Sequence, residues 1–82
     1  MRRSPLHELA SNTPSRIAAI DWTALNDSEA QRLRAFGFEV GAHVELLHRA
    51  GLFGGDPIAI KIGRMTVALR RAVAKSIEVS PL

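Results

Sequence analysis

Residues 32–47 read RLRAFGFEVGAHVELL, and this stretch decides the fold because a helical pattern changes there into a strand pattern. Leu33 and Phe36 are three positions apart, which puts them on one face of a helix. Gly37 follows at the point where a residue in the left-handed conformation commonly ends a helix. After Gly41, apolar and polar residues alternate as they do in a half-buried strand. The stretch predicts a short helix that leads directly into a strand.

The start of this helix has two interpretations. Either Asn26 is the N-cap and Glu29 reaches back to it, or Ser28 is the N-cap and Gln31 does so. The leucine before Asn26 favours the first interpretation, because an apolar residue there packs on the next turn. In both cases the helix is expected to extend to about Phe36, and it is too short to be stable without packing.

The rest of the chain contains short alternating runs separated by turn residues. Ile58, Ile60 and Ile62 give the clearest strand, and Gly63 with Arg64 forms a two-residue connection to the next one. The first strand has its apolar residues out of strict alternation, which suits a strand with a bulge. Strands are expected at residues 16–22, 42–49, 57–62, 65–69 and 77–79, with a helical turn at residues 70–76. Five short strands, one inserted helix and one helical turn predict a mainly β fold, a small closed or nearly closed barrel.

The length of 82 residues allows one domain. We expect the barrel to occupy residues 16–82 and residues 1–15, with two prolines, to be flexible or loosely packed. The chain has no cysteine, which excludes disulfides, thiolate metal sites and thiol catalysis and fits an intracellular protein. No apolar run approaches the roughly 20 residues of a membrane span.

Positive charge is concentrated in the second half of the chain. The formal net charge is +3, and residues 49–75 carry six Lys and Arg against the single acid Asp56. This half either presents a basic face to an acidic partner or forms a solvated surface with no specific partner.

Residue types that can act in catalysis or bind cofactors are present, but their spacing does not suit either role. His7, His43 and His48 lack the spacing of metal ligands, and a strand places the last two on opposite faces. There is no nucleophile elbow and no phosphate-binding loop. The sequence therefore predicts no enzymatic activity, no cofactor and no metal site. Leu52 and Phe53 stand between glycines in a loop, where they either plug the end of the barrel or contact a partner.

Several short motifs, in this order, resemble the FeoA family over about residues 17–79. They are Arg32-Leu33, Phe36-Gly37, Gly41, the run Gly55-Asp56-Pro57, the run from Ala68 to Arg71, and Ala74, Ile77 and Val79. Two features depart from the family pattern: the loop after the second strand lacks a common proline, and bulky Phe36 and Phe38 replace smaller residues. These departures leave the fold expectation intact and concern the contacts of the loop.

The resemblance implies an SH3-like barrel and a small cytosolic component of bacterial ferrous iron transport. Such a protein acts on the GTP-hydrolysing part of the FeoB membrane transporter, tuning or assembling it, and reaches the inner membrane only through that partner. Weak self-association is compatible with this role. The residues expected to bind the partner are Arg32, Leu52, Phe53, Arg64, Arg70 and Arg71. For Arg32, a structural bridge to an acid is the alternative.

The sequence is also compatible with two other functions. The first is a nucleic-acid-binding barrel, which the basic charge permits but the small number of aromatic residues disfavours. The second is a metal-linked regulatory domain, because similar barrels occur at the end of iron-dependent repressors. The chain has no DNA-binding helices and a poor set of metal ligands.

Overall fold

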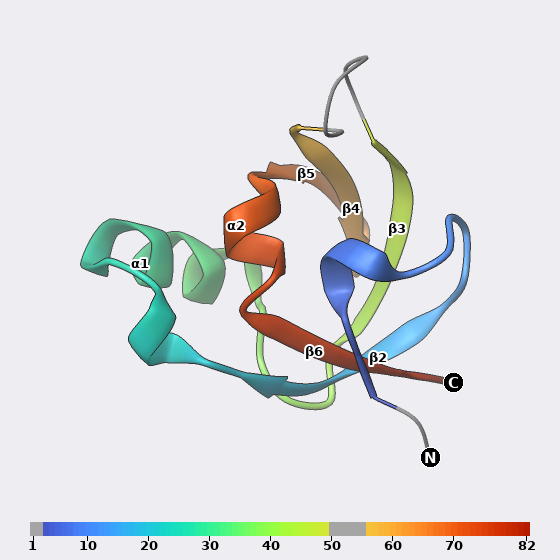
Figure 1. Cartoon of the computed structure of the whole chain (residues 1–82), viewed down its shortest axis with the longest axis horizontal. Coiled ribbons are helices and arrows are strands. Elements are labelled where there is room, and N and C mark those ends of the chain that lie inside the picture. The colour runs from blue at the N-terminus through green and yellow to red at the C-terminus, as the bar shows by residue number, and fades with distance from the viewer. Residues whose placement is uncertain (1–2, 50–55) are drawn as a thin grey trace.

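The computed structural model describes residues 3–49 and 56–82, which form one bent sheet of six strands (Figure 1). The strands are β1 (Ser4–Pro5), β2 (Ser15–Ile20), β3 (His43–Arg49), β4 (Ile58–Ile62), β5 (Met65–Leu69) and β6 (Ile77–Pro81). They pair in the order β1-β6-β2-β3-β4-β5, each antiparallel to its neighbour. The predicted small, mainly β fold is confirmed, with one strand more than expected.

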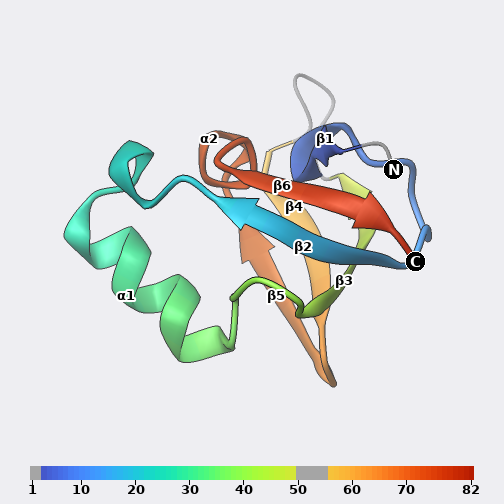
Figure 2. The same ribbon diagram turned by 90° about the horizontal axis from the view of Figure 1, so that it is seen from below.

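Four short helices interrupt the strands in the described part of the chain. Two are 3-10 turns, η1 (Leu6–Glu8) and η2 (Trp22–Ala24), and two are α-helices, α1 (Asp27–Phe36) and α2 (Arg71–Ala74). Helix α1 connects β2 to β3 and lies to one side of the sheet (Figure 2). Helix α2 is the predicted helical turn before the last strand. The inserted helix and this turn are therefore both confirmed.

Helix α1 begins and ends where its sequence signals indicate. The backbone N–H of Glu29 donates to Oδ1 of Asn26 over 2.8 Å, and the N–H of Asn26 donates to Oε1 of Glu29 over 3.0 Å. At the other end, Gly37 has φ 91°, and the N–H of Phe38 donates to the carbonyl of Leu33 over 3.0 Å. This reciprocal cap confirms the start at Asn26.

The cap gives a first testable prediction. Asn26→Ala is expected to lower the free energy of unfolding by about 1 kcal/mol, because it removes the acceptor for an otherwise unpaired N–H. Ser28→Ala, which removes the alternative cap, should change stability by less than about 0.5 kcal/mol. Urea denaturation of both variants measures the difference. An equal or larger cost for Ser28→Ala would contradict the assignment.

The hairpin of β4 and β5 has the predicted two-residue turn. Ile62 pairs with Met65, and Gly63 between them has φ 57°, the positive angle that a tight hairpin turn requires at this position. Ile58, Ile60 and Ile62 are all buried. The alternation seen in the sequence thus places one face of β4 in the core.

Two bulges shift the register of the sheet. The predicted bulge in the first strand lies between Ile17 and Ala19, where the pairing of β2 with β6 shifts. A second shift, between Leu46 and His48 in β3, did not follow from the sequence. Strict alternation would put His48 on the same side of the strand as Val44 and Leu46, which are buried, whereas His48 is exposed. The extra residue of a bulge breaks the strict alternation of side chains.

The N-terminal segment packs more tightly than its composition suggests. Residues 1–15 were expected to be flexible or loosely packed, but Leu6 and Leu9 are buried and β1 pairs with β6. Nη2 of Arg49 donates to the backbone carbonyls of His7, over 2.7 Å, and of Leu9, over 3.0 Å. Two buried leucines and charge-assisted hydrogen bonds from Arg49 of β3 therefore hold this segment against the rest of the domain.

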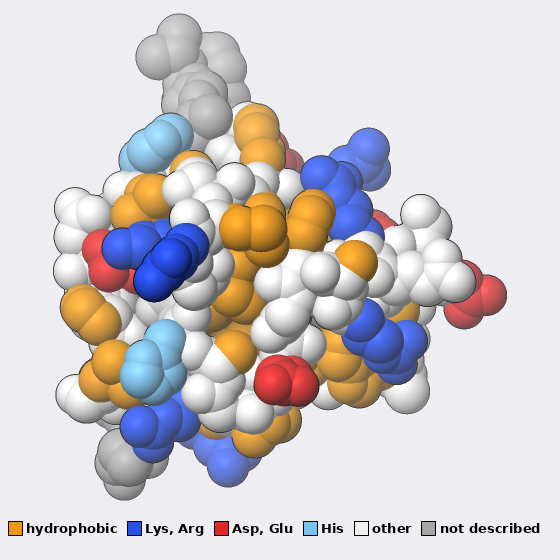
Figure 3. Space-filling view, turned by 180° about the vertical axis from the view of Figure 1, so that it is seen from behind, with side chains coloured by type: hydrophobic (Ala, Val, Ile, Leu, Met, Phe, Trp, Pro, Cys, Tyr) orange, Lys and Arg blue, Asp and Glu red, His pale blue; other side chains and the backbone are white. Residues whose placement is uncertain are grey.

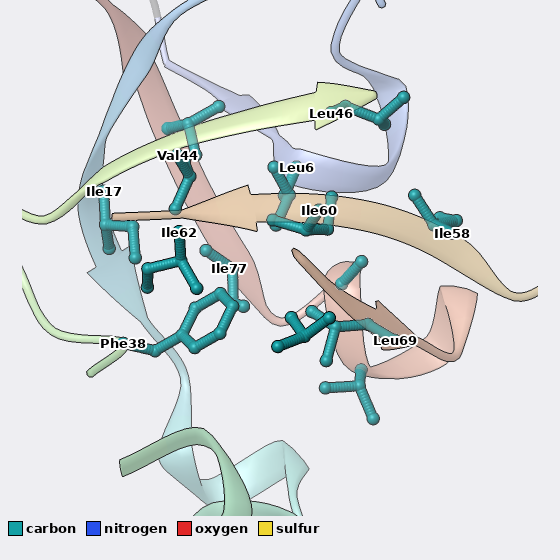
Figure 4. Packing of buried hydrophobic residues seen from close by; sticks show 14 of the residues in the cluster. Leu6, Ile17, Phe38, Val44, Leu46, Ile58, Ile60, Ile62, Leu69 and Ile77 are labelled. Carbon is teal, nitrogen blue, oxygen red and sulfur yellow. The ribbon is translucent and has the colours of Figure 1, made fainter. Parts of the chain in front are cut away.

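The core collects apolar side chains from every strand after β1 and from three of the helical segments. Figure 4 shows Phe38 pointing toward Ile62 and Ile77 within the buried cluster. Leu33 of α1 is 1% exposed, so the helix is anchored through one buried leucine. The fully buried side chains include Leu6, Ile17, Leu46, Ile60, Ile77 and Val79.

His7 is a buried titratable group in this packing. It is 8% exposed, its Nε2 lies 3.5 Å from a carboxylate oxygen of Glu8, and its Nδ1 has no hydrogen-bond partner among the described residues. Burial lowers the pKa of His7; Glu8 opposes this effect, while Arg71, Lys75 and Arg49 add to it. The neutral imidazole is therefore the favoured form in the folded protein.

This lowered pKa predicts a loss of stability in mild acid. Below about pH 6.5, the ordinary pKa of a histidine side chain, the unfolded chain binds more protons than the folded protein, so stability falls as the pH drops. Urea denaturation at about pH 7.5 and about pH 5.5 should show this loss, and His7→Gln should reduce it. His43→Gln, at an exposed site, is the control. An identical pH dependence in His7→Gln and the native protein would refute the role of His7.

Candidate partner-binding groove

A groove of about 440 Å³ separates α1 from the end of β5 and the start of α2. Leu33, Leu69 and Val73 lie at its base and are also part of the hydrophobic core. The other lining residues, which form its rim, are Asn26, Ser28, Glu29, Arg32, Pro57, Ala68 and Arg70. The groove thus has an apolar base and a mainly polar rim, the composition of a binding surface.

Two of the arginines expected to bind a partner line this groove. Arg32 comes from α1, and Arg70 follows β5 directly, so the fold places them on opposite sides. Both are exposed. The guanidinium carbon of Arg32 lies 5.5 Å from the ring centroid of Phe36, within the range of a cation–π contact. Among the described residues no ion pair joins Arg32 to an acid, so the structure does not contain the alternative structural bridge.

The acid at the groove is already engaged. Oε1 of Glu29 accepts the backbone N–H of Asn26 in the helix cap. The residues that line the groove thus include two arginines and one glutamate, and the carboxylate of this glutamate is held in the cap. The groove carries a net positive charge and suits an anionic group on a partner.

The other predicted contact residues lie elsewhere. Arg64 is in the turn at the far end of β5, and Arg71 begins α2. The backbone N–H of Arg71 donates to Oδ1 of Asp56 over 2.6 Å, and its charge acts on His7. Leu52 and Phe53 lie outside the described residues.

Sequence reasoning missed most of the groove residues and misjudged one arginine. Asn26 was recognised only as a helix cap, and Ser28 and Ala68 were given no functional role, although all three line the groove. Arg49 was counted with the basic face, but it holds the N-terminal segment through hydrogen bonds.

The face opposite the one in Figure 1 shows how charge and apolar surface are distributed. Apolar side chains gather near its middle, with Lys and Arg side chains around them (Figure 3). Mixed surfaces of this kind are typical of protein interaction sites, where an apolar centre has a polar surround.

Within residues 3–49 and 56–82, no three His, Asp or Glu side chains lie close enough to hold a metal ion together. No helix formed by these residues has the length and apolarity needed to cross a bilayer.

The sequence model of the FeoA domain matches residues 4–81. The chain belongs to the FeoA family. The match begins at Ser4 and so includes the N-terminal segment, whose Leu6 and Leu9 are buried. The resemblance inferred from the sequence motifs is thus confirmed.

Two solved FeoA structures are similar along nearly the whole chain. FeoA of Stenotrophomonas maltophilia, solved in complex with zinc and described as a prokaryotic SH3 domain protein, is 33% identical with a TM-score of 0.76; the match covers 92% of this chain and 87% of that one. FeoA of Chlorobium tepidum is 29% identical with a TM-score of 0.82, covering 96% of this chain and 70% of that one. The SH3-like fold expected for an FeoA protein is confirmed.

The fold also occurs in a larger regulator. A manganese-dependent transcriptional repressor is similar with a TM-score of 0.81 at 20% identity, over 98% of this FeoA chain and 42% of the repressor. At this identity the likeness concerns the fold alone. No curated protein matches the sequence.

Proposed function

We propose that this FeoA-family protein is a non-enzymatic accessory protein that binds the cytosolic, GTP-hydrolysing part of an FeoB-like transporter and modulates ferrous iron transport. Membership of the family supports the link to iron transport. The similar Stenotrophomonas maltophilia protein is described as a candidate activating factor of bacterial ferrous iron transport.

The observation that carries the proposal is the groove between α1 and the β5–α2 junction. Arg32 and Arg70 stand on its two sides, and core leucines form its base. An acidic partner segment gains charge-assisted bonds from the arginines and apolar contact at the base. The combination of an apolar base with charged residues at the rim suits a segment of a protein surface.

We propose that the other residues expected to contact the partner extend this binding surface. Arg64 and Arg71 add positive charge near the two ends of β5. Leu52 and Phe53 are proposed to provide an apolar contact or to close the barrel end. The protein is proposed to be cytoplasmic and to approach the inner membrane through its partner. Binding should weaken with increasing salt, because exposed charges are screened.

Ferrous iron uptake in a strain that lacks the gene tests this function. Uptake of labelled ferrous iron should fall and should recover when the native gene is returned, while ferric iron uptake stays unchanged. Extracts of the complemented strain should also yield the transporter together with the tagged protein. Normal ferrous uptake in the deletion strain, or no association with the transporter, would refute the proposal.

A further inference from the structure

Strand β5 forms one edge of the sheet and has an unpaired side. Its partner on the other side is β4, and the opposite edge of the sheet is the two-residue strand β1. Ile62 and Met65 flank a two-residue turn and therefore form a hydrogen-bonded pair. Because bonded and non-bonded pairs alternate, Thr66 and Ala68 direct their backbone N–H and C=O groups away from β4.

These outward groups have no partner within the described chain. No backbone hydrogen bond from another described element reaches Thr66 or Ala68, and no described side chain bonds to them either. Both residues are exposed, and Ala68 lines the groove. The free edge of β5 therefore opens toward the groove at its Ala68 end and supplies donors and acceptors at strand spacing.

Arginines mark both ends of this edge. Arg64 precedes β5 in the turn, Arg70 follows its last residue, and Arg32 lines the same groove as Arg70. Five strand residues span about 17 Å, so the positive charges are separated by roughly the length of a short extended peptide. The spacing favours a ligand with acids near its two ends and a free backbone between them.

We propose that an extended acidic segment of the partner adds to the edge of β5 as a further strand. Its backbone pairs with Thr66 and Ala68, and carboxylates near its two ends meet Arg64 at one end and Arg70 with Arg32 at the other. Backbone bonds supply affinity in this mode, and the terminal acids supply specificity. This inference rests on the proposed function for the identity of the partner, whereas the mode of binding is tested separately.

The same charges disfavour a second copy of the chain as the occupant. In an antiparallel pair of two β5 edges, Arg64 of one copy would meet Arg70 of the other, and facing like charges destabilise such a pair. Charged residues that flank an exposed edge are a common means of preventing self-association. An acidic segment would be attracted to the same arginines, and for this reason we assign the edge to a different molecule.

A synthetic peptide tests the mode of binding directly. The probe has about seven residues, with glutamate at both ends and alternating valine and threonine between them; the control peptide has lysine at both ends. With isotope-labelled protein, saturating acidic peptide should slow amide hydrogen exchange at Thr66 and Ala68 by about tenfold or more. The lysine peptide should not. Equal effects of both peptides, or protection only at other strands, would overturn the proposal.

Two variants separate edge pairing from general charge attraction. Ala68→Pro removes an outward N–H without removing a bond to β4, so it should abolish peptide binding while the thermal transition remains cooperative. If this variant does not fold, Arg64→Glu combined with Arg70→Glu replaces it, and this pair should reverse the preference from the acidic to the lysine peptide. Retained binding in folded Ala68→Pro, or an unchanged preference in the charge variant, would contradict the inference.

The cytosolic part of the cognate transporter forms the last arm of the experiment. If it does not bind the protein but the acidic peptide does, the proposed function fails and the binding mode stands. If it binds without protecting Thr66 and Ala68, the binding mode fails and the function stands. Protection that rises with protein concentration alone would indicate a second copy at the edge and would overturn the assignment.

Discussion

Replacement of Ile60 by alanine is expected to lower the free energy of unfolding by about 2 to 5 kcal/mol. Ile60 is 0% exposed and lies in the middle of β4, opposite Leu46 of β3 and Val67 of β5. Truncation loses the transfer free energy of the removed carbons and leaves a cavity among three strands. Chemical denaturation followed by circular dichroism measures the loss. In so small a domain this effect approaches the whole stability.

Two control variants make the result specific to packing. Ile60→Val removes a single carbon and should cost only about 0.5 to 1.5 kcal/mol. Lys61→Ala alters the exposed neighbour on the same strand and should stay within about 0.5 kcal/mol of the native protein. A larger loss for Lys61→Ala than for Ile60→Ala would show that the inward face of β4 is wrongly assigned.

Reversal of both groove arginines is expected to have the largest effect on function. Arg32→Glu combined with Arg70→Glu should lower the affinity for the cytosolic part of the transporter by about tenfold or more. The two carboxylates would repel an acidic segment and would leave Glu29 without a nearby positive charge. Calorimetric titration measures the affinity, and the free energy of unfolding should change little because both residues are exposed.

A matched charge change away from the groove controls for the overall charge. Arg16→Glu combined with Lys61→Glu alters the net charge by the same amount, and neither residue lines the groove. This control should retain most of the affinity at physiological salt, where distant exposed charges are screened. An equal loss in both double variants would show that long-range charge, and not the groove, governs binding.

Local signals predicted much of the fold. The cap at Asn26 and the left-handed Gly37 fixed the bounds of α1, and Gly63 fixed the hairpin, because each depends on residues only a few positions apart. The alternation in β4 correctly predicted which side chains face the core. In these places local preference and global packing agree, and such places are the most predictable from a sequence.

Features that depend on distant partners could not be predicted. Leu6 and Leu9 stand among prolines and polar residues, and only pairing with β6 and hydrogen bonds from Arg49 show that they belong to the core. The outward turn of His48 depends on a bulge against β4. The groove likewise joins α1 to the end of β5 across more than thirty residues of sequence, so the sequence indicated Arg32 and Arg70 individually but not their shared site.

The most direct test of the account is a titration of isotope-labelled protein with the cytosolic part of its cognate transporter, followed by backbone amide resonances. We expect saturable shifts that concentrate in α1, along β5 and at the start of α2, around Arg32 and Arg70. Shifts confined to β2 and β3, or no shifts at concentrations where the two proteins otherwise associate, would contradict the groove as the site of partner binding.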